Sequence, residues 1–170
     1  LEGWSQTASE LQIWNYGINY YVPAAPFPNF AVIGSNLRSF AKYRATAVFE
    51  QGGDAFCHLA ALRMWLTSKL LWNPALDEKK LMDEFLNGYY REAAPHIKKY
   101  IELLQKNALE SKYYMSVYEN DVTRFIPVES LPALSHCISQ ALKMVKDDRK
   151  LRQRILELKF SSDISWLECS

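Results

Sequence analysis

The sequence has few glycines, cysteines and histidines and no excess of charge of either sign. Its 170 residues include 6 Gly, 3 Cys and 3 His, and 20 basic residues against 19 acidic residues give a formal net charge of +1. A nearly neutral chain attracts phosphate groups weakly, which argues against a general nucleic-acid binder. The most apolar stretch, residues 56–66, already contains His58 and Arg63, so no run approaches the ~18 apolar residues of a membrane span. We therefore expect neither nucleic acid nor a membrane as partner.

The cysteines and histidines show no pattern typical of a metal or redox site. Cys57, Cys137 and Cys169 are far apart and odd in number, which favours separate core thiols over a disulfide framework. The sequence contains no HExxH motif, no phosphate-binding loop and no dinucleotide fingerprint. We therefore expect no metal and no cofactor.

Apolar and aromatic residues are abundant. The chain is 49% apolar and 14% aromatic, with ten Tyr and five Trp, so it can bury a substantial core. Tyr and Trp combine a flat apolar face with a polar tip, so such an excess indicates either large core side chains or an aromatic binding surface. Six of these rings are concentrated in one short region, namely Trp14, Tyr16, Tyr20, Tyr21, Phe27 and Phe30.

The first part of the chain has the pattern of two β/α units. Residues 11–16 are β-branched and aromatic and precede a proline-rich loop, which predicts a short strand. Asn29 can cap a helix that extends to about Tyr43. Residues 45–50 predict a second strand, which the glycines after Gln51 terminate. A strand, a helix, a strand and a helix in this order are typical of a parallel sheet.

The periodicity is helical from Asp54 onward. Phe56 and the leucines that follow predict a helix that stops at Trp72, before Asn73 and Pro74. Asp77 is a predicted helix cap, and later helices are expected from about residues 95, 130 and 150, with a loop over 161–170. The fold class is therefore α/β to mainly α, with β/α units over residues 1–76 and a helical region over 77–170.

Candidate binding residues lie where the two predicted strands end. In α/β sheets and barrels, function gathers at the carboxyl ends of the strands. Aromatic rings stack on the apolar faces of sugars, while amides and carboxylates bind their hydroxyls, so a carbohydrate site is one interpretation. The other is that the aromatics fill a loop or a barrel and Glu50 is a solvated turn residue. The candidate residues are Trp14, Asn15, Tyr16, Tyr21, Glu50 and Gln51.

Catalysis by this chain alone is not expected. Glycosidases use two carboxyl groups about 5–9.5 Å apart. The only acidic residues before position 77 are Glu2, Glu10, Glu50 and Asp54, and the last two share one loop. Catalytic carboxylates usually approach a substrate from different strands, so a complete pair is not predicted here.

Four ordered motifs show a family resemblance. The runs WNY (14–16), FEQG (49–52), LLWNP (70–74) and EFLNGYY (84–90), in this order, resemble the bacterial family termed domain of unknown function 4838, common in polysaccharide-degrading gut bacteria. The resemblance extends over about residues 4–110. Members look like glycoside hydrolases with a (β/α)8 barrel.

The resemblance implies both a fold and a function. Residues 11–16 and 45–50 would be the seventh and eighth barrel strands, and Trp14, Tyr16, Glu50 and Gln51 would face the mouth of the active site. The longer protein would hydrolyse O-glycosidic bonds, in a periplasmic, secreted or cell-surface setting, and this chain would supply sugar-binding residues. Strands one to six are absent, so we expect a piece of a larger unit that self-associates through its exposed sheet edge. The alternative is a non-catalytic helical module for protein interactions.

Overall fold

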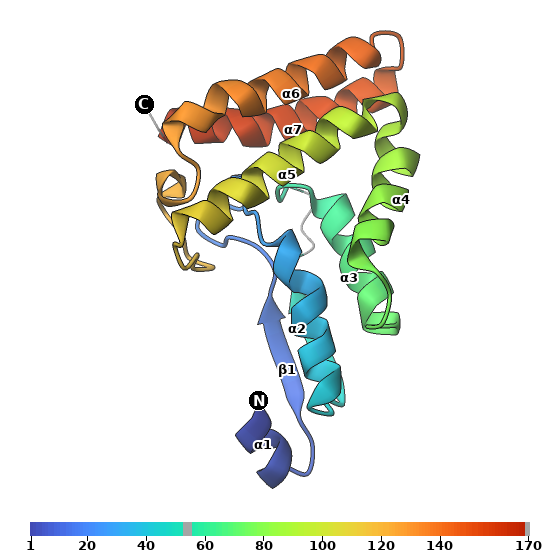
Figure 1. Cartoon of the computed structure of the whole chain (residues 1–170), viewed down its shortest axis with the longest axis vertical. Helices are drawn as coiled ribbons and strands as arrows, with labels where there is room; N and C mark the ends of the chain where they lie inside the picture. The colour runs from blue at the N-terminus through green and yellow to red at the C-terminus, as the bar shows by residue number, and fades with distance from the viewer. Residues whose placement is uncertain (53–55, 169–170) are drawn as a thin grey trace.

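The computed structural model describes residues 1–52 and 56–168 of the chain. Figure 1 shows β1, α2 and α1 at one end of the molecule and a layer of long helices at the other. The elements are α1 (Glu2–Thr7), β1 (Gln12–Tyr16), α2 (Phe30–Lys42), β2 (Ala47–Gln51), α3 (Ala60–Trp72), α4 (Glu78–Tyr90), η1 (Arg91–Ala93), α5 (Ala94–Ser111), η2 (Val122–Arg124), η3 (Val128–Ser130), α6 (Leu131–Met144) and α7 (Arg149–Glu168), where η marks a short 3₁₀ helix.

The two predicted strands form one parallel pair. β1 and β2 are joined through α2, and their register places Gln12 opposite Ala47 and Tyr16 opposite Gln51. The prediction of two β/α units is therefore confirmed, with the second strand displaced by one or two residues toward the carboxyl end. Within the described residues this sheet has two strands and does not close into a barrel.

Helix α3 begins later than its periodicity predicts. The pattern predicts a helix from Asp54, which lies outside the described residues, but α3 starts at Ala60. Leu59 has a left-handed backbone with φ of 52°, which a helix cannot contain, so the preceding residues form turns. Phe56, predicted to lie on the buried face, is consequently 86% exposed.

Helix α3 ends and helix α4 begins at local sequence signals. Asn73 is extended and ends α3 immediately before Pro74. Asp77 caps α4, because its Oδ1 accepts hydrogen bonds from the backbone N–H groups of Lys79 (2.9 Å) and Lys80 (3.2 Å). The boundary predicted at residue 76 falls in the turn between these two helices, which pack against each other.

Helices α5, α6 and α7 form a layer across the carboxyl end of β1 (Figure 1). Apolar side chains at helical spacing face one another inside this layer and join the core that α3 and α4 also line. The largest fully buried side chain is Tyr100 of α5. Other buried members are Ile97, Ile101, Leu104, Leu134, Ile138, Leu151, Ile155 and Leu158.

The predicted loop at the carboxyl end is wrong, because α7 continues to Glu168. Ser161, Ser162 and Ser165 are buried in the helix, and these small side chains allow α7 to lie close to its neighbours. Trp166 is 41% exposed and donates a hydrogen bond from Nε1 to Ser135 Oγ of α6 at 2.9 Å. A polar helix face that packs through serines has no clear apolar period, which explains the error.

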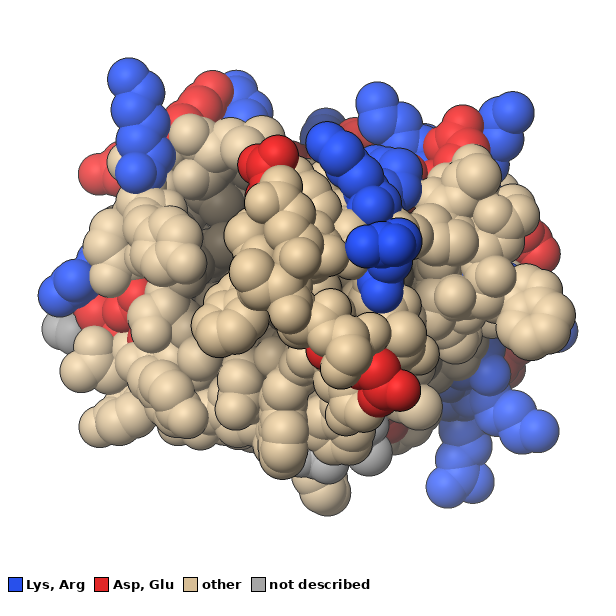
Figure 2. Space-filling model, turned by 90° about the horizontal axis from the view of Figure 1, so that it is seen from below, with Lys and Arg blue, Asp and Glu red and all other residues tan. Residues whose placement is uncertain are grey.

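None of the helices in the described ranges is long and apolar enough to span a membrane. Uncharged side chains make up most of the surface seen from below, and many Lys and Arg side chains project from its edges (Figure 2).

Candidate functional site

The strands place the predicted site residues on two opposite faces of the sheet. Successive side chains of a strand point in opposite directions, and the register pairs Trp14 with Phe49, Asn15 with Glu50 and Tyr16 with Gln51. Ile13 and Val48 pack against the helical core, so Asn15 and Glu50, which share their face, point toward the helices. Trp14 and Tyr16 point the other way.

The second face, which we call the open face, is aromatic and largely uncovered in the described structure. Trp14 is 63% exposed, Phe49 55% and Tyr16 40%. The Trp14 and Phe49 rings meet edge to face with centroids 4.9 Å apart, and Tyr16 stacks near Trp14 at 6.4 Å. Trp14 Nε1 donates a hydrogen bond to Gln51 Oε1 at 3.0 Å. Three of the six predicted residues are therefore brought together here, namely Trp14, Tyr16 and Gln51.

Tyr21 lies apart from this cluster, in the loop after β1. Its ring is 66% exposed, and its backbone N–H donates to Asn19 Oδ1 at 2.9 Å. None of the ring contacts found among the described residues involves Tyr21.

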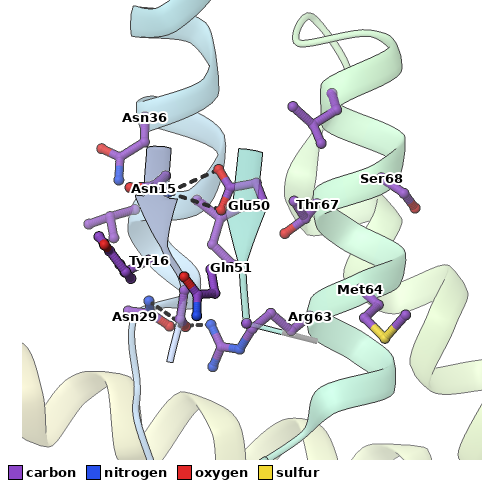
Figure 3. A pocket seen from close by; sticks show the side chains of 15 residues that line it. Asn15, Tyr16, Asn29, Asn36, Glu50, Gln51, Arg63, Met64, Thr67 and Ser68 are labelled. Atoms are coloured by element: carbon purple, nitrogen blue, oxygen red, sulfur yellow. Dashed lines mark hydrogen bonds between the residues drawn. The ribbon is translucent and has the colours of Figure 1, made fainter. Parts of the chain in front are cut away.

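A pocket of about 240 Å³ lies on the helix side of the sheet, between α2 and α3 (Figure 3). Figure 3 shows Asn15 and Glu50 at the strands, Asn36 on one side, and Thr67 and Ser68 on α3. Tyr16 and Gln51, at the carboxyl ends of the strands, also contribute to its lining. The helical walls are mixed: Val32, Ile33, Met64 and Leu71 contribute apolar surface, and Asn36, Arg63, Thr67 and Ser68 contribute polar groups.

Glu50 is a half-buried carboxylate held by a neighbouring amide. Asn15 Nδ2 donates hydrogen bonds to Glu50 Oε1 (2.9 Å) and Oε2 (3.0 Å) across the strand pair. Burial raises the pKa of Glu50, and the Asn15 hydrogen bonds and the positive charge of Arg63 oppose this shift. The two hydrogen bonds link β1 to β2 near the carboxyl end of the sheet. Just beyond this point the backbones of Gly52 and Gly17 lie close together.

Arg63 is a buried cation that the sequence reasoning did not select. Its side chain is 3% exposed, its guanidinium donates to Asn29 Oδ1 and to the Phe27 carbonyl (3.2 Å), and it lies 4.5 Å above the Phe30 ring. Burial lowers the pKa of Arg63 to about 10. An arginine four residues after Leu59, within the apolar period of α3, is the signal that could have identified it.

Among the described residues that line the pocket, Glu50 is the one acidic side chain. Among residues 1–52 and 56–168, no three His, Cys, Asp or Glu side chains gather as metal ligands. Asp54, considered as a second carboxylate beside Glu50, lies outside the described residues. The geometry suits binding through flat aromatic faces and amide groups better than proton transfer.

The sequence profile of one family, described as Domain of unknown function (DUF4838), matches residues 1–102. The chain therefore belongs to this family, and the matched segment contains both strands and ends within α5. Comparisons with curated proteins and with solved structures found no match.

Proposed function

We propose that this chain forms one wall of a carbohydrate-binding pocket in a glycoside-hydrolase-like barrel. β1 and β2 would be two adjacent strands of a (β/α)8 barrel, with the open face turned toward its interior. O-glycosyl hydrolysis, in a periplasmic or cell-surface setting, would then be the activity of the whole protein. This chain would bind sugar without supplying the catalytic carboxylates.

The observation that carries this proposal is the uncovered aromatic face of a parallel sheet. α2 and α3 cover one face of the strand pair, as barrel helices do, while Trp14 and Phe49 are more than half exposed on the other. Parallel sheets are normally buried on both faces, so large exposed rings on one face indicate a missing cover. Further barrel strands would provide it, since each strand in the described structure has only one partner.

The strand positions suggest separate roles for the candidate residues. Tyr16 and Gln51 lie at the carboxyl ends of their strands, where barrel enzymes bind substrate, so we assign the sugar contacts to them. Trp14 lies one layer deeper and orients the Gln51 amide through its Nε1 hydrogen bond. Asn15 and Glu50 face the helices, so we assign them to fixing the ends of the two strands.

Tryptophan fluorescence tests the proposal, since Trp14 lies beside the assigned contacts. The chain would be titrated with neutral oligosaccharides and with uronic acids. We expect a saturable change that Trp14→Phe abolishes, because it removes the reporter, and that Trp72→Phe preserves, because Trp72 is 91% exposed at the end of α3. Tyr16→Ala should weaken binding about five- to tenfold, the usual loss for a stacked ring.

The variant Glu50→Gln tests whether the helix side of the sheet contributes to sugar binding as the open face does. It keeps a side chain of similar size on the helix side, so we expect sugar affinity to change less than in Tyr16→Ala. If no tested sugar changes the fluorescence, or if Tyr16→Ala binds as tightly as the unmodified chain, the carbohydrate proposal is wrong. The helical interaction module then becomes the better hypothesis.

A further inference from the structure

We infer that the aromatic surface continues from the sheet onto the helical part of the chain, so that the site takes an extended oligosaccharide and Tyr118 determines which chain length it prefers. This inference rests on the proposed carbohydrate function and deepens it. It assigns the outer sugar units to a residue beyond the segment matched by the family profile, which ends at residue 102.

Four rings form a continuous series, which we call the aromatic ladder: Trp14, Tyr16, Tyr20 and Tyr118. The ring centroids lie 6.4 Å apart between Trp14 and Tyr16, 5.5 Å between Tyr16 and Tyr20, and 6.1 Å between Tyr20 and Tyr118. The ladder starts on the open face of β1, passes through the loop that follows it, and ends in the loop between α5 and η2. It therefore leads away from the strand ends onto the helical layer.

Hydrogen bonds between the two loops hold the end of the ladder in place. The Tyr20 backbone N–H donates to the Val117 carbonyl at 2.6 Å, and Asn19 Nδ2 donates to the Glu119 carbonyl at 2.8 Å. Asn19 is fully buried, and its Oδ1 also accepts from the backbone N–H groups of Tyr21 (2.9 Å) and Val22 (3.3 Å). A preorganised surface of this kind loses little entropy when a ligand binds.

Tyr118 combines a ring contact within the ladder with a largely exposed side chain. Its side chain is 65% exposed, although its ring adjoins Tyr20. A flat ring that is tilted by 44° against its neighbour and largely open to solvent suits a sugar unit that stacks on it. A single sugar ring can cover only part of the ladder, so its full length suits a ligand of several linked units.

The experiment measures affinity against ligand length. A series from disaccharide to hexasaccharide, of the sugar and linkage that bind the unmodified chain, would be titrated against the unmodified chain, Tyr118→Ser and Tyr118→Phe. The control is Tyr114→Ser, because Tyr114 lies in the same loop, is 90% exposed and is outside the ladder.

We expect affinity to increase with length for the unmodified chain, for Tyr118→Phe and for Tyr114→Ser. Tyr118→Ser should bind the longest ligands about five- to tenfold more weakly and the disaccharide unchanged. If Tyr118→Ser fails to fold, as judged by circular dichroism, Tyr118→Leu serves instead, because it keeps apolar bulk beside Tyr20 but lacks the flat face.

Two contrary results can be distinguished. If Tyr118→Ser loses the same affinity at every ligand length, Tyr118 has only a packing role, and if it loses none, Tyr118 has no role in binding. Either result overturns the inference and leaves the proposed function intact. Absence of binding by the unmodified chain overturns both.

Discussion

Acidification should destabilise this protein through one buried histidine, His58. The side chain is 2% exposed, belongs to the turn before α3, and shares a 3.3 Å contact between its Nε2 and the hydroxyl of Tyr100 in α5. Its Nδ1 has no hydrogen-bond partner among the described residues. Burial, together with the nearby positive charge of Arg63, lowers the pKa of His58 to about 3. The imidazole therefore stays neutral in the folded protein at pH values at which an exposed histidine takes up a proton.

The size and direction of the effect follow from proton linkage. Between pH 6.5 and pH 3 the unfolded chain binds a proton at His58 and the folded chain does not, so the free energy of unfolding falls as the pH falls. The slope approaches about 1.4 kcal/mol per pH unit below the ordinary pKa, which gives a loss of about 2 kcal/mol between pH 7.5 and pH 5.0. At pH 7.5 the histidine is neutral in both states, and the contribution vanishes.

Urea unfolding at a series of pH values measures this loss. His58→Gln removes the titrating group but retains a polar side chain for the Tyr100 hydroxyl. The raised pKa of Glu50 changes the stability in the opposite direction as the pH falls. Because Glu50 is present in both chains, the difference between their pH profiles isolates the effect of His58. His136→Gln, on the exposed side of α6, controls for the removal of a histidine. Parallel profiles for the unmodified chain and His58→Gln between pH 7.5 and pH 5.0 would refute the reasoning.

Three further predictions concern packing and assembly. Asn19→Ala should lower the free energy of unfolding by about 2–3 kcal/mol in urea titration, since it removes three hydrogen bonds made by a fully buried side chain, and a change below about 0.5 kcal/mol would contradict this. Leu66→Ala, at a fully buried position of α3, should cost about 3 kcal/mol, whereas Leu109→Ala, at a side chain 70% exposed, should stay within about 0.5 kcal/mol; equal losses would contradict the assigned core. If β1 and β2 are barrel strands without their neighbours, sedimentation should show self-association of the chain, and a stable monomer would count against the barrel proposal.

Several elements could be predicted because their signals are local. β1 is marked by Ile13, Trp14 and Tyr16 ahead of a proline-rich loop, and α4 begins at an aspartate whose side chain caps it. The split of the candidate site was also readable, since neighbouring residues of one strand, such as Trp14 and Asn15, must point to opposite faces. The prediction did not use this alternation and grouped Glu50 with Trp14 and Tyr16, whereas the Glu50 side chain faces the helices and lines the pocket on that side of the sheet.

Other features were missed because the local pattern was ambiguous. The start of α3 depends on a left-handed residue, Leu59, that an apolar period does not reveal. The last turns of α7 carry buried serines, a residue type that is common in loops. The short helix α1 at the amino end has no buried residue and thus no amphipathic pattern from which it could be predicted.

The sequence by itself determined the succession of two β/α units and a helical region, because strand-forming residues, turn residues and helix caps act over a few positions. It also determined the family to which residues 1–102 belong, because the order of short motifs along the chain needs no tertiary contact to be read. Only the tertiary structure decided which side chains meet. The contact between Asn19 and Glu119 joins residues 100 positions apart, and it places Tyr118 at the end of the aromatic ladder. Such a contact depends on how the helical layer packs against the sheet, which no local pattern records.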